Sequence, residues 1–148
     1  MAAKTRDEAF TDDERAALKE RAAEIKKARS RGTGSKKAEA DAKDCHDTIA
    51  AMPDDERAIG EALQEIVSAQ APDLMARTWY GMPAWTRDGN VVVFFKYASK
   101  FKMRYSEVGF QEDANLDDGD MWPTVFAVTS ASPAVRKKLT ALVKNAVS

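Results

Sequence analysis

Five carboxylates within nine residues are the side chains of this sequence best suited to hold a ligand. From Asp113 the chain reads Asp-x-Asn-x-Asp, which is how a calcium-binding EF-hand loop begins. The pattern then fails, because its sixth position is Asp118 instead of glycine and its twelfth is Thr124 instead of glutamate. Oxygen ligands still suit hard cations such as iron, manganese, magnesium and calcium. The sequence therefore predicts a weak metal site, or alternatively a solvated acidic loop, at Glu112, Asp113, Asp117, Asp118 and Asp120.

A second candidate site surrounds the segment 79–85, in which Gly-Met-Pro separates two tryptophan-bearing extended pieces. Pro83 restricts Met82 to extended geometry, so the chain turns tightly and the two tryptophans can wall an apolar pocket. Alternation over 100–105 predicts a strand with cations on one face, which could form a floor for anions. Core packing of the aromatic residues and a solvated cationic face are the alternatives. The predicted cleft consists of Trp79, Tyr80, Met82, Pro83, Trp85, Lys96, Lys102, Arg104 and Trp122.

The sequence offers no recognisable pairing of a nucleophile with a base. Cys45 and His46 are the only cysteine and histidine, and neighbours on a helix point about 100° apart. Alanines stand four residues on either side of His46, so no helical pair of metal ligands forms. Residues 32–37 have the composition of a phosphate-binding loop without its spacing. We therefore predict a non-enzymatic protein without a firmly implied cofactor.

Composition and charge argue against several classes of protein. The 148 residues fit one domain, and 23 basic against 24 acidic side chains give a net charge of −1. The excess of cations that binds DNA or RNA is therefore missing. No apolar run approaches the ~20 residues of a membrane span, and the N-terminus turns acidic where a signal peptide would be apolar. Together with the single cysteine, these features predict a cytoplasmic protein with neither a nucleic acid nor a membrane as partner.

Helices are predicted before and after an aromatic-rich middle part. Thr11-Asp12-Asp13-Glu14 has the form of a capping box, from which a helix with a thin apolar stripe should run to about Arg29. A Gly/Ser-rich linker follows over 30–35. Further helices are expected over 37–52 and 54–70, and another from Pro133. We therefore divide the chain into a charged helical N-terminal extension with its linker, residues 1–35, and an α+β domain, residues 36–148.

The aromatic-rich part predicts a sheet. Extended segments are expected over 77–80, 84–87, 91–95, 100–105 and 124–129, with Asp88-Gly89 as a hairpin turn. Helices, several strands and a final helix are the order typical of an α+β fold. We expect an antiparallel sheet of about five strands, packed against N-terminal helices and a C-terminal helix.

The motif Trp-Tyr-Gly-Met-Pro-Ala-Trp over 79–85 also supports a family resemblance, together with Asp88-Gly89 and the earlier segment Ile49-Ala50-Ala51-Met52-Pro53. From about Asp47 to Ser148 the chain resembles the YdhG-like family, domain of unknown function 1801. It is also similar to a bacterial, actinobacterial-type subgroup with a charged N-terminal extension. The resemblance implies a YdhG-like, frataxin-like α+β fold.

Some members of this family are regarded as frataxin-like intracellular iron chaperones. The resemblance therefore implies weak iron binding through carboxylates, and iron–sulfur or haem assembly proteins as partners. Frataxins carry their acidic residues on the first helix and an adjoining strand edge, whereas the densest acids here lie in a late loop. The helical acids that could be their equivalent are Asp54, Asp55, Glu56, Glu61 and Glu65.

Three hypotheses of function follow. The first is a non-enzymatic binding protein, an iron chaperone by resemblance. The second is a small-ligand domain that holds an aromatic or anionic molecule between the 79–85 turn and the basic strand. The third is a protein–protein interaction module in which residues 11–29 dock on a partner. We expect a monomer or a weak dimer.

Overall fold

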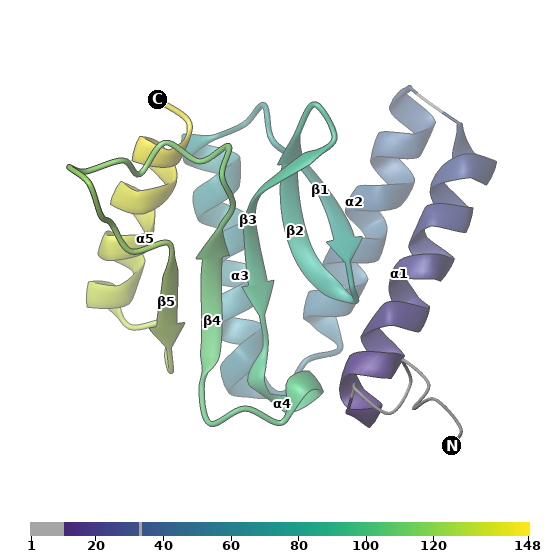
Figure 1. The fold of residues 1–148 in the computed structure, drawn as a ribbon, viewed down its shortest axis with the longest axis horizontal. Coiled ribbons are helices and arrows are strands. Elements are labelled where there is room, and N and C mark those ends of the chain that lie inside the picture. Colours follow the sequence, from purple (N-terminus) through teal and green to yellow (C-terminus); the bar gives the residue numbers. More distant parts are fainter. Residues whose placement is uncertain (1–10, 33) are drawn as a thin grey trace, which may run out of the picture.

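Helices flank a central sheet in the computed structural model, which describes residues 11–32 and 34–148 (Figure 1). Three helices precede the first strand, a single helical turn interrupts the sheet and a final helix ends the chain. In chain order the elements are α1 (Asp12–Arg31), α2 (Ser35–Ala50), α3 (Asp54–Gln70), β1 (Met75–Trp79), β2 (Met82–Arg87), β3 (Asn90–Lys96), α4 (Ala98–Phe101), β4 (Ser106–Phe110), β5 (Val125–Val128) and α5 (Pro133–Ala146).

The five strands form one antiparallel sheet in the order β1-β2-β3-β4-β5, so each strand pairs with its neighbour in the sequence. Two-residue turns make the first two connections, Tyr80–Gly81 between β1 and β2 and Asp88–Gly89 between β2 and β3. All four turn residues have positive φ, the conformation that tight hairpins require. The predicted α+β arrangement of N-terminal helices, antiparallel sheet and C-terminal helix is confirmed.

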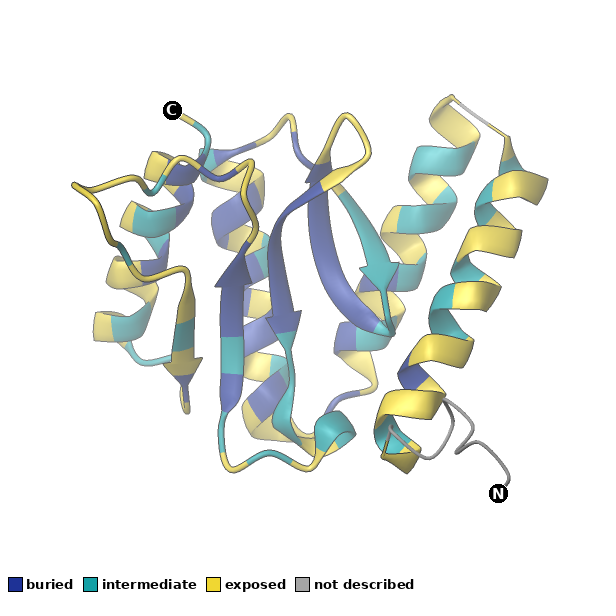
Figure 2. Cartoon of the chain, viewed as in Figure 1, coloured by how far each residue is buried: buried dark blue, intermediate teal, exposed yellow. Residues whose placement is uncertain are grey.

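The main hydrophobic core lies between the sheet and the helices α2, α3 and α5, which stand behind it or beside it in Figure 1. Ile49 of α2, Leu63 of α3 and Val143 of α5 are almost completely buried, and Phe95 of β3 meets them from the sheet. Figure 2 shows the buried residues concentrated in the central strands and on the helix faces turned toward them. This face of the sheet is therefore fully covered.

The opposite face of the sheet carries a second, smaller apolar cluster. Met82 and Ala84 of β2 form it with Val91 and Phe94 of β3. Three partly buried aromatic residues pack against this cluster, namely Trp79, Tyr80 and Phe101. Figure 1 shows this face turned toward the viewer, with α4 and the edge of α1 near it. We call it the open face.

α1 lies beside β1 and α2 and is held mainly by polar contacts. Ala17 is its one buried residue, whereas the Arg31 guanidinium binds the carboxylates of Asp41 (2.7 Å) and Asp44 (3.0 Å) on α2. The predicted cap is confirmed, because the Thr11 hydroxyl accepts a hydrogen bond from the Glu14 amide at 3.1 Å. The helix ends two residues beyond the predicted Arg29. Of the predicted extension, residues 1–10 and Thr33 lie outside the described residues.

The predicted strand over 100–105 is wrong. Residues 98–101 form the helical turn α4, Lys102 adopts a left-handed conformation, and the strand β4 begins only at Ser106. The cause is a distant acid: the buried Glu56 carboxylate accepts hydrogen bonds from the Ser99 amide and hydroxyl, both at 2.6 Å. The predicted turn over 81–83 is also shifted, since Met82 and Pro83 belong to β2.

Among the described helices, none combines the length and the apolar character needed to cross a membrane.

Candidate functional site

An apolar groove runs across the open face of the sheet, from α1 toward β5. Its volume is about 480 Å³, which lies within the usual range of small-molecule sites. Side chains of α1, of all five strands, of the β1–β2 turn and of α4 line it. They are Glu14, Ala17, Leu18, Trp79, Tyr80, Met82, Phe94, Lys96, Phe101, Glu107 and Val125.

The floor of the groove is set by strand register. Ala84, Phe94, Gly109 and Val125 are successive partners across β2, β3, β4 and β5, so their side chains share the open face. Gly109 has no side chain, and the Phe94 ring occupies that space: a Cβ at Gly109 would overlap the ring. Because Gly109 has no side chain, the Phe94 ring can lie flat against the backbone of β4, and the space above the ring stays open as the groove.

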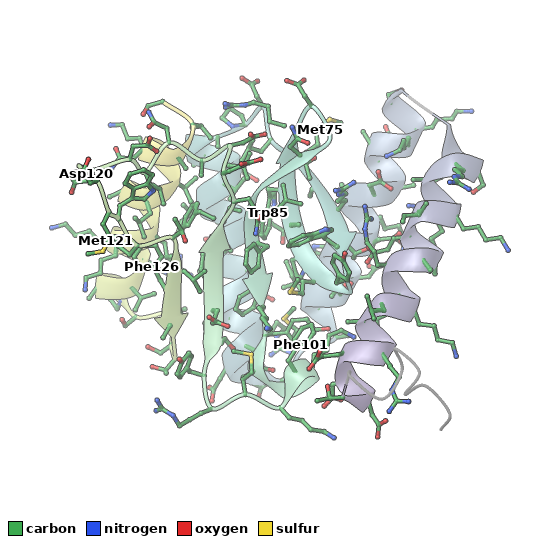
Figure 3. The ribbon with its side chains drawn as sticks, viewed as in Figure 1. Met75, Trp85, Phe101, Asp120, Met121 and Phe126 are labelled. Atoms are coloured by element: carbon green, nitrogen blue, oxygen red, sulfur yellow. The ribbon has the colours of Figure 1, made fainter. Side chains whose placement is uncertain are left out.

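Aromatic rings form the wall nearest β1. The Trp79 ring meets the Phe94 ring edge-on with centroids 5.5 Å apart, and it meets the Tyr80 ring in the same way at 5.2 Å. Phe101 closes one end of the groove: it belongs to α4 and lies on the side of α4 that is near α1 (Figure 3). Aromatic faces in such an arrangement stabilise flat apolar molecules.

Two exposed aliphatic side chains stand at opposite margins of the groove. Leu18 on α1 is 42% exposed and Val125 on β5 is 46% exposed. A ligand that covers these two side chains removes their apolar surface from water, which favours binding. The margins of the groove are therefore suited to contact an apolar ligand.

Three charged groups line the groove. The Lys96 ammonium lies 5.1 Å from the centroid of the Phe101 ring, a cation–π geometry. Glu107 is the register partner of Lys96 on β4, and Glu14 lies at the α1 end. Two carboxylates against one ammonium leave no surplus of positive charge.

The structure brings together only part of the predicted cleft. Trp79, Tyr80, Met82 and Lys96 line the groove as expected. Trp85 instead lies in the main core on the other face, 2% exposed, and Pro83 is also buried away from the groove. The reason is strand parity: Trp79 pairs with Met82 across the two-residue turn, so Trp85 falls on the opposite side of β2 from Met82.

The predicted floor of cations is not formed either. Lys102 is exposed and lies 3.6 Å from Asp13 of α1, and the Arg104 guanidinium stacks over the Tyr105 ring at 5.0 Å. Both residues follow α4 and do not belong to a strand, so they do not share a face with Lys96. Trp122 lies in the long connection between β4 and β5, outside the groove.

The acidic stretch forms that long connection. All five of its carboxylate residues are exposed: Glu112, Asp113, Asp117, Asp118 and Asp120. The loop is anchored in its middle, because the Asn115 amide donates to the Ala146 carbonyl at the end of α5 (2.9 Å) and Ala114 is buried. Asp120 and Met121 project at its outer edge (Figure 3). Within residues 11–32 and 34–148, no three His, Cys, Asp or Glu side chains converge on a metal position.

Four of the five helical acids predicted on α3 have partners within the protein, namely Asp54, Glu56, Glu61 and Glu65. Glu56 caps α4 as described above, and Asp54 binds the Arg57 guanidinium at 2.9 Å. The other two pairs are longer: Glu61 lies 3.8 Å from Arg57, and Glu65 lies 3.2 Å from Arg136 of α5. These acids therefore stabilise the fold locally.

Cys45 and His46 point in different directions, as expected. The Cys45 thiol is completely buried, and this burial raises its pKa to about 12. His46 is exposed on the outer side of α2. A thiol that stays protonated is a poor nucleophile.

Several groove residues escaped the sequence analysis. Phe94 and Val125 sit in short apolar strands whose alternation does not reveal which face is open. Gly109 and the α1 residues Glu14 and Leu18 reach the groove only through tertiary packing. For Leu18 a signal existed, since it belongs to the thin apolar stripe of the first helix.

Comparison of the chain with protein-family models, curated proteins and solved structures gives no match.

Proposed function

We propose that this protein is a binding domain whose groove on the open face holds a small aromatic or apolar molecule. One observation carries the proposal. Aromatic rings form the floor and one wall of the groove, and two exposed aliphatic side chains, Leu18 and Val125, stand at its margins. Covering these margins and the rings beneath them would remove apolar surface from water, at about 25 cal/mol per Å².

The charges of the groove favour recognition of the ring system over recognition of an anion. Lys96 is the one cation of the lining, and Glu14 and Glu107 are also present. Of the other predicted cations, Lys102 lies beside Asp13 and Arg104 stacks on Tyr105. A neutral ring therefore meets no unfavourable charge, whereas a carboxylate would meet two like charges for each opposite one.

A matched series of indole, indole-3-acetate and tryptamine tests this assignment, because the three share one ring and differ in charge. Binding is followed by the backbone amide resonances of Phe94 and Gly109. We expect indole to shift the two amides and to bind at least as tightly as indole-3-acetate. Binding of indole-3-acetate alone would contradict the assignment and favour an anionic ligand.

Two variants test whether indole binds in the groove, because each replaces an exposed apolar side chain by aspartate, one in the groove and one outside it. Val125→Asp places a charge at the groove margin, whereas Met75→Asp places one on β1, where Met75 is 53% exposed and lines a separate hollow between α2 and α3. Indole binding should weaken about tenfold or more in Val125→Asp and stay unchanged in Met75→Asp. Equal binding by wild type and Val125→Asp would exclude the groove as the site.

A further inference from the structure

The turn between β1 and β2 binds a carboxylate. The amides of Tyr80 and Gly81 donate to the two oxygens of Glu24 on α1, at 3.1 Å to Oε2 and 2.9 Å to Oε1. Both turn residues have positive φ, +52° and +77°. Successive N–H groups in such a turn form a concavity that suits an anion. Glu24 therefore fills a receptor site that the sheet itself provides.

A second glutamate of α1 binds beside it. Glu20, one helical turn before Glu24, forms an ion pair with the Lys100 ammonium of α4. Gly81 has a φ of +77°, which favours glycine, and the Glu20 carboxylate at the end of its side chain lies where a Cβ of residue 81 would stand. The Arg21 guanidinium lies 5.9 Å from the centroid of the Tyr80 ring. Two glutamates four residues apart thus enclose Gly81.

The rest of α1 contributes little apolar contact. Ala17 alone is buried, and its two largest aliphatic residues, Leu18 and Ile25, are 42% and 40% exposed. Around the helix end, Gly32 and Gly34 have positive φ and no atom within 4 Å of an added Cβ. A helix held chiefly by charged and hydrogen-bonded contacts is stabilised by terms that salt screens. Its attachment to the sheet is therefore mainly polar.

We propose that the Tyr80–Gly81 turn with Lys100 is a docking site for an acidic helix, which α1 occupies as an internal ligand. The outside partner that the site would accept is a protein helix with two glutamates four residues apart and a small residue three positions before the first of them. In α1 these positions are Ala17, Glu20 and Glu24. Docking of the partner displaces α1 and removes Glu14, Ala17 and Leu18 from the wall of the groove.

This proposal is independent of the ligand proposed for the groove. The floor residues Phe94 and Gly109 belong to the sheet and stay in place when α1 leaves. Binding of indole to the groove can therefore fail while the docking site is real, and the reverse also holds.

Hydrogen exchange of the full-length chain tests whether the two glutamates hold α1. In Glu20→Gln/Glu24→Gln the amides of Tyr80 and Gly81 should exchange about tenfold faster or more, because each loses a charged acceptor. The amides of Val93 and Phe95, deep in the sheet, should not change and report that the variant is folded. Glu61→Gln/Glu65→Gln is the matched control, since it also removes two glutamates four residues apart and should leave Tyr80 and Gly81 unaffected.

A peptide of residues 11–31 tests whether the site accepts a helix from outside. At millimolar concentration it should shift the Tyr80 and Gly81 amides of the Glu20→Gln/Glu24→Gln chain. It should hardly shift those of the wild type, whose own α1 has a high effective concentration. The same peptide with glutamine at positions 20 and 24 should not bind.

Unchanged exchange at Tyr80 and Gly81 in the double variant, or no response to the peptide, would overturn the proposal. Lys100→Met serves if the double variant does not fold, because it removes the partner of Glu20 and leaves the sequence of α1 intact. Lys100→Met should also make the Gly81 amide exchange faster than in the wild type. Unchanged exchange at Gly81 in this variant would count against the proposal.

Discussion

The Phe94 ring on β3 rests on the bare backbone of its register partner Gly109 on β4. The two residues depend on each other, because any side chain at position 109 would overlap the ring. The floor of the groove is thus defined by the absence of one Cβ. This relationship links the stability of the sheet to the capacity of the groove.

Gly109→Ala should therefore destabilise the protein by about 1–3 kcal/mol, the usual effect of overpacking. The displaced ring would also rise into the groove and weaken indole binding. Urea unfolding measures the first effect, and amide shifts measure the second. In a Phe94→Ala background the same change should be close to neutral, because the overlap is gone. A full penalty in that background would mean that strain arises elsewhere.

The contact between Glu56 and Ser99 should contribute substantially to stability, since the Glu56 carboxylate is buried and accepts two hydrogen bonds at 2.6 Å. Glu56→Gln is expected to lower the free energy of unfolding by about 1–3 kcal/mol, because the amide nitrogen cannot accept. A double-mutant cycle with Ser99→Ala should give a coupling energy well above zero. Asp55→Asn, an exposed neighbour on α3, is the control and should have little effect. Additive effects of the two changes would contradict the assigned contact.

Stability should fall at alkaline pH because two buried groups resist ionisation. Burial raises the pKa of Cys45 from 9.0 to about 12, and burial, with Glu20 and Glu56 nearby, raises the pKa of Tyr97 from 10.0 to about 12. Both groups ionise more readily in the unfolded chain, so their contribution is complete below pH 9 and is lost as the pH rises toward 12. For Cys45 the loss amounts to about 4 kcal/mol.

Urea unfolding under reducing conditions at pH 8 and at pH 10.5 measures the first part of this loss, about 2 kcal/mol for Cys45. Cys45→Ala and Tyr97→Phe should each flatten the pH dependence, whatever their effect at pH 8. The native thiol should also resist modification by a disulfide reagent at pH 8. Rapid modification without unfolding would contradict the completely buried position of Cys45.

Iron binding by the acidic loop, which the YdhG-like resemblance implies, is expected to be weak. Because no three ligand side chains converge within the described part of the chain, the dissociation constant for ferrous iron should be on the order of millimolar. An anaerobic titration followed by amide resonances should shift residues 112–120 alone. Asp117→Asn/Asp118→Asn should abolish the shifts, and Asp54→Asn/Asp55→Asn should not. Unmoved signals at millimolar iron would remove the basis of the iron-chaperone hypothesis.

The sequence predicted most of the fold because local signals determine it. The apolar stripe of α3, with proline on each side, gave its bounds 54–70, and Asp88-Gly89 gave the hairpin between β2 and β3. The strand over 100–105 failed because alternation there was overruled by Glu56, which lies 43 residues from Ser99.

Only some of the residues that line the groove could be predicted from the sequence, for a similar reason. Which tryptophan faces it depends on the number of residues in the turn: Tyr80 and Gly81 alone form the turn, so Trp79 faces the groove and Trp85 faces the core. The contribution of α1 depends on where the helix docks, and its contacts with the Tyr80–Gly81 turn and Lys100 join residues more than fifty positions apart in the chain. Tertiary contacts between distant residues decide which face of a strand is open and where a helix packs, and the local sequence pattern does not contain this information.

The meander order of the sheet has a consequence for how the protein is made. Each strand can pair with the one synthesised just before it, and the first two connections are two-residue turns. The main core is different, because Leu139, Val143 and Ala146 of α5 complete it from the far end of the chain. The strands can therefore assemble before α5 is synthesised, whereas the face of α3 that carries Leu63 is covered only once α5 packs on it.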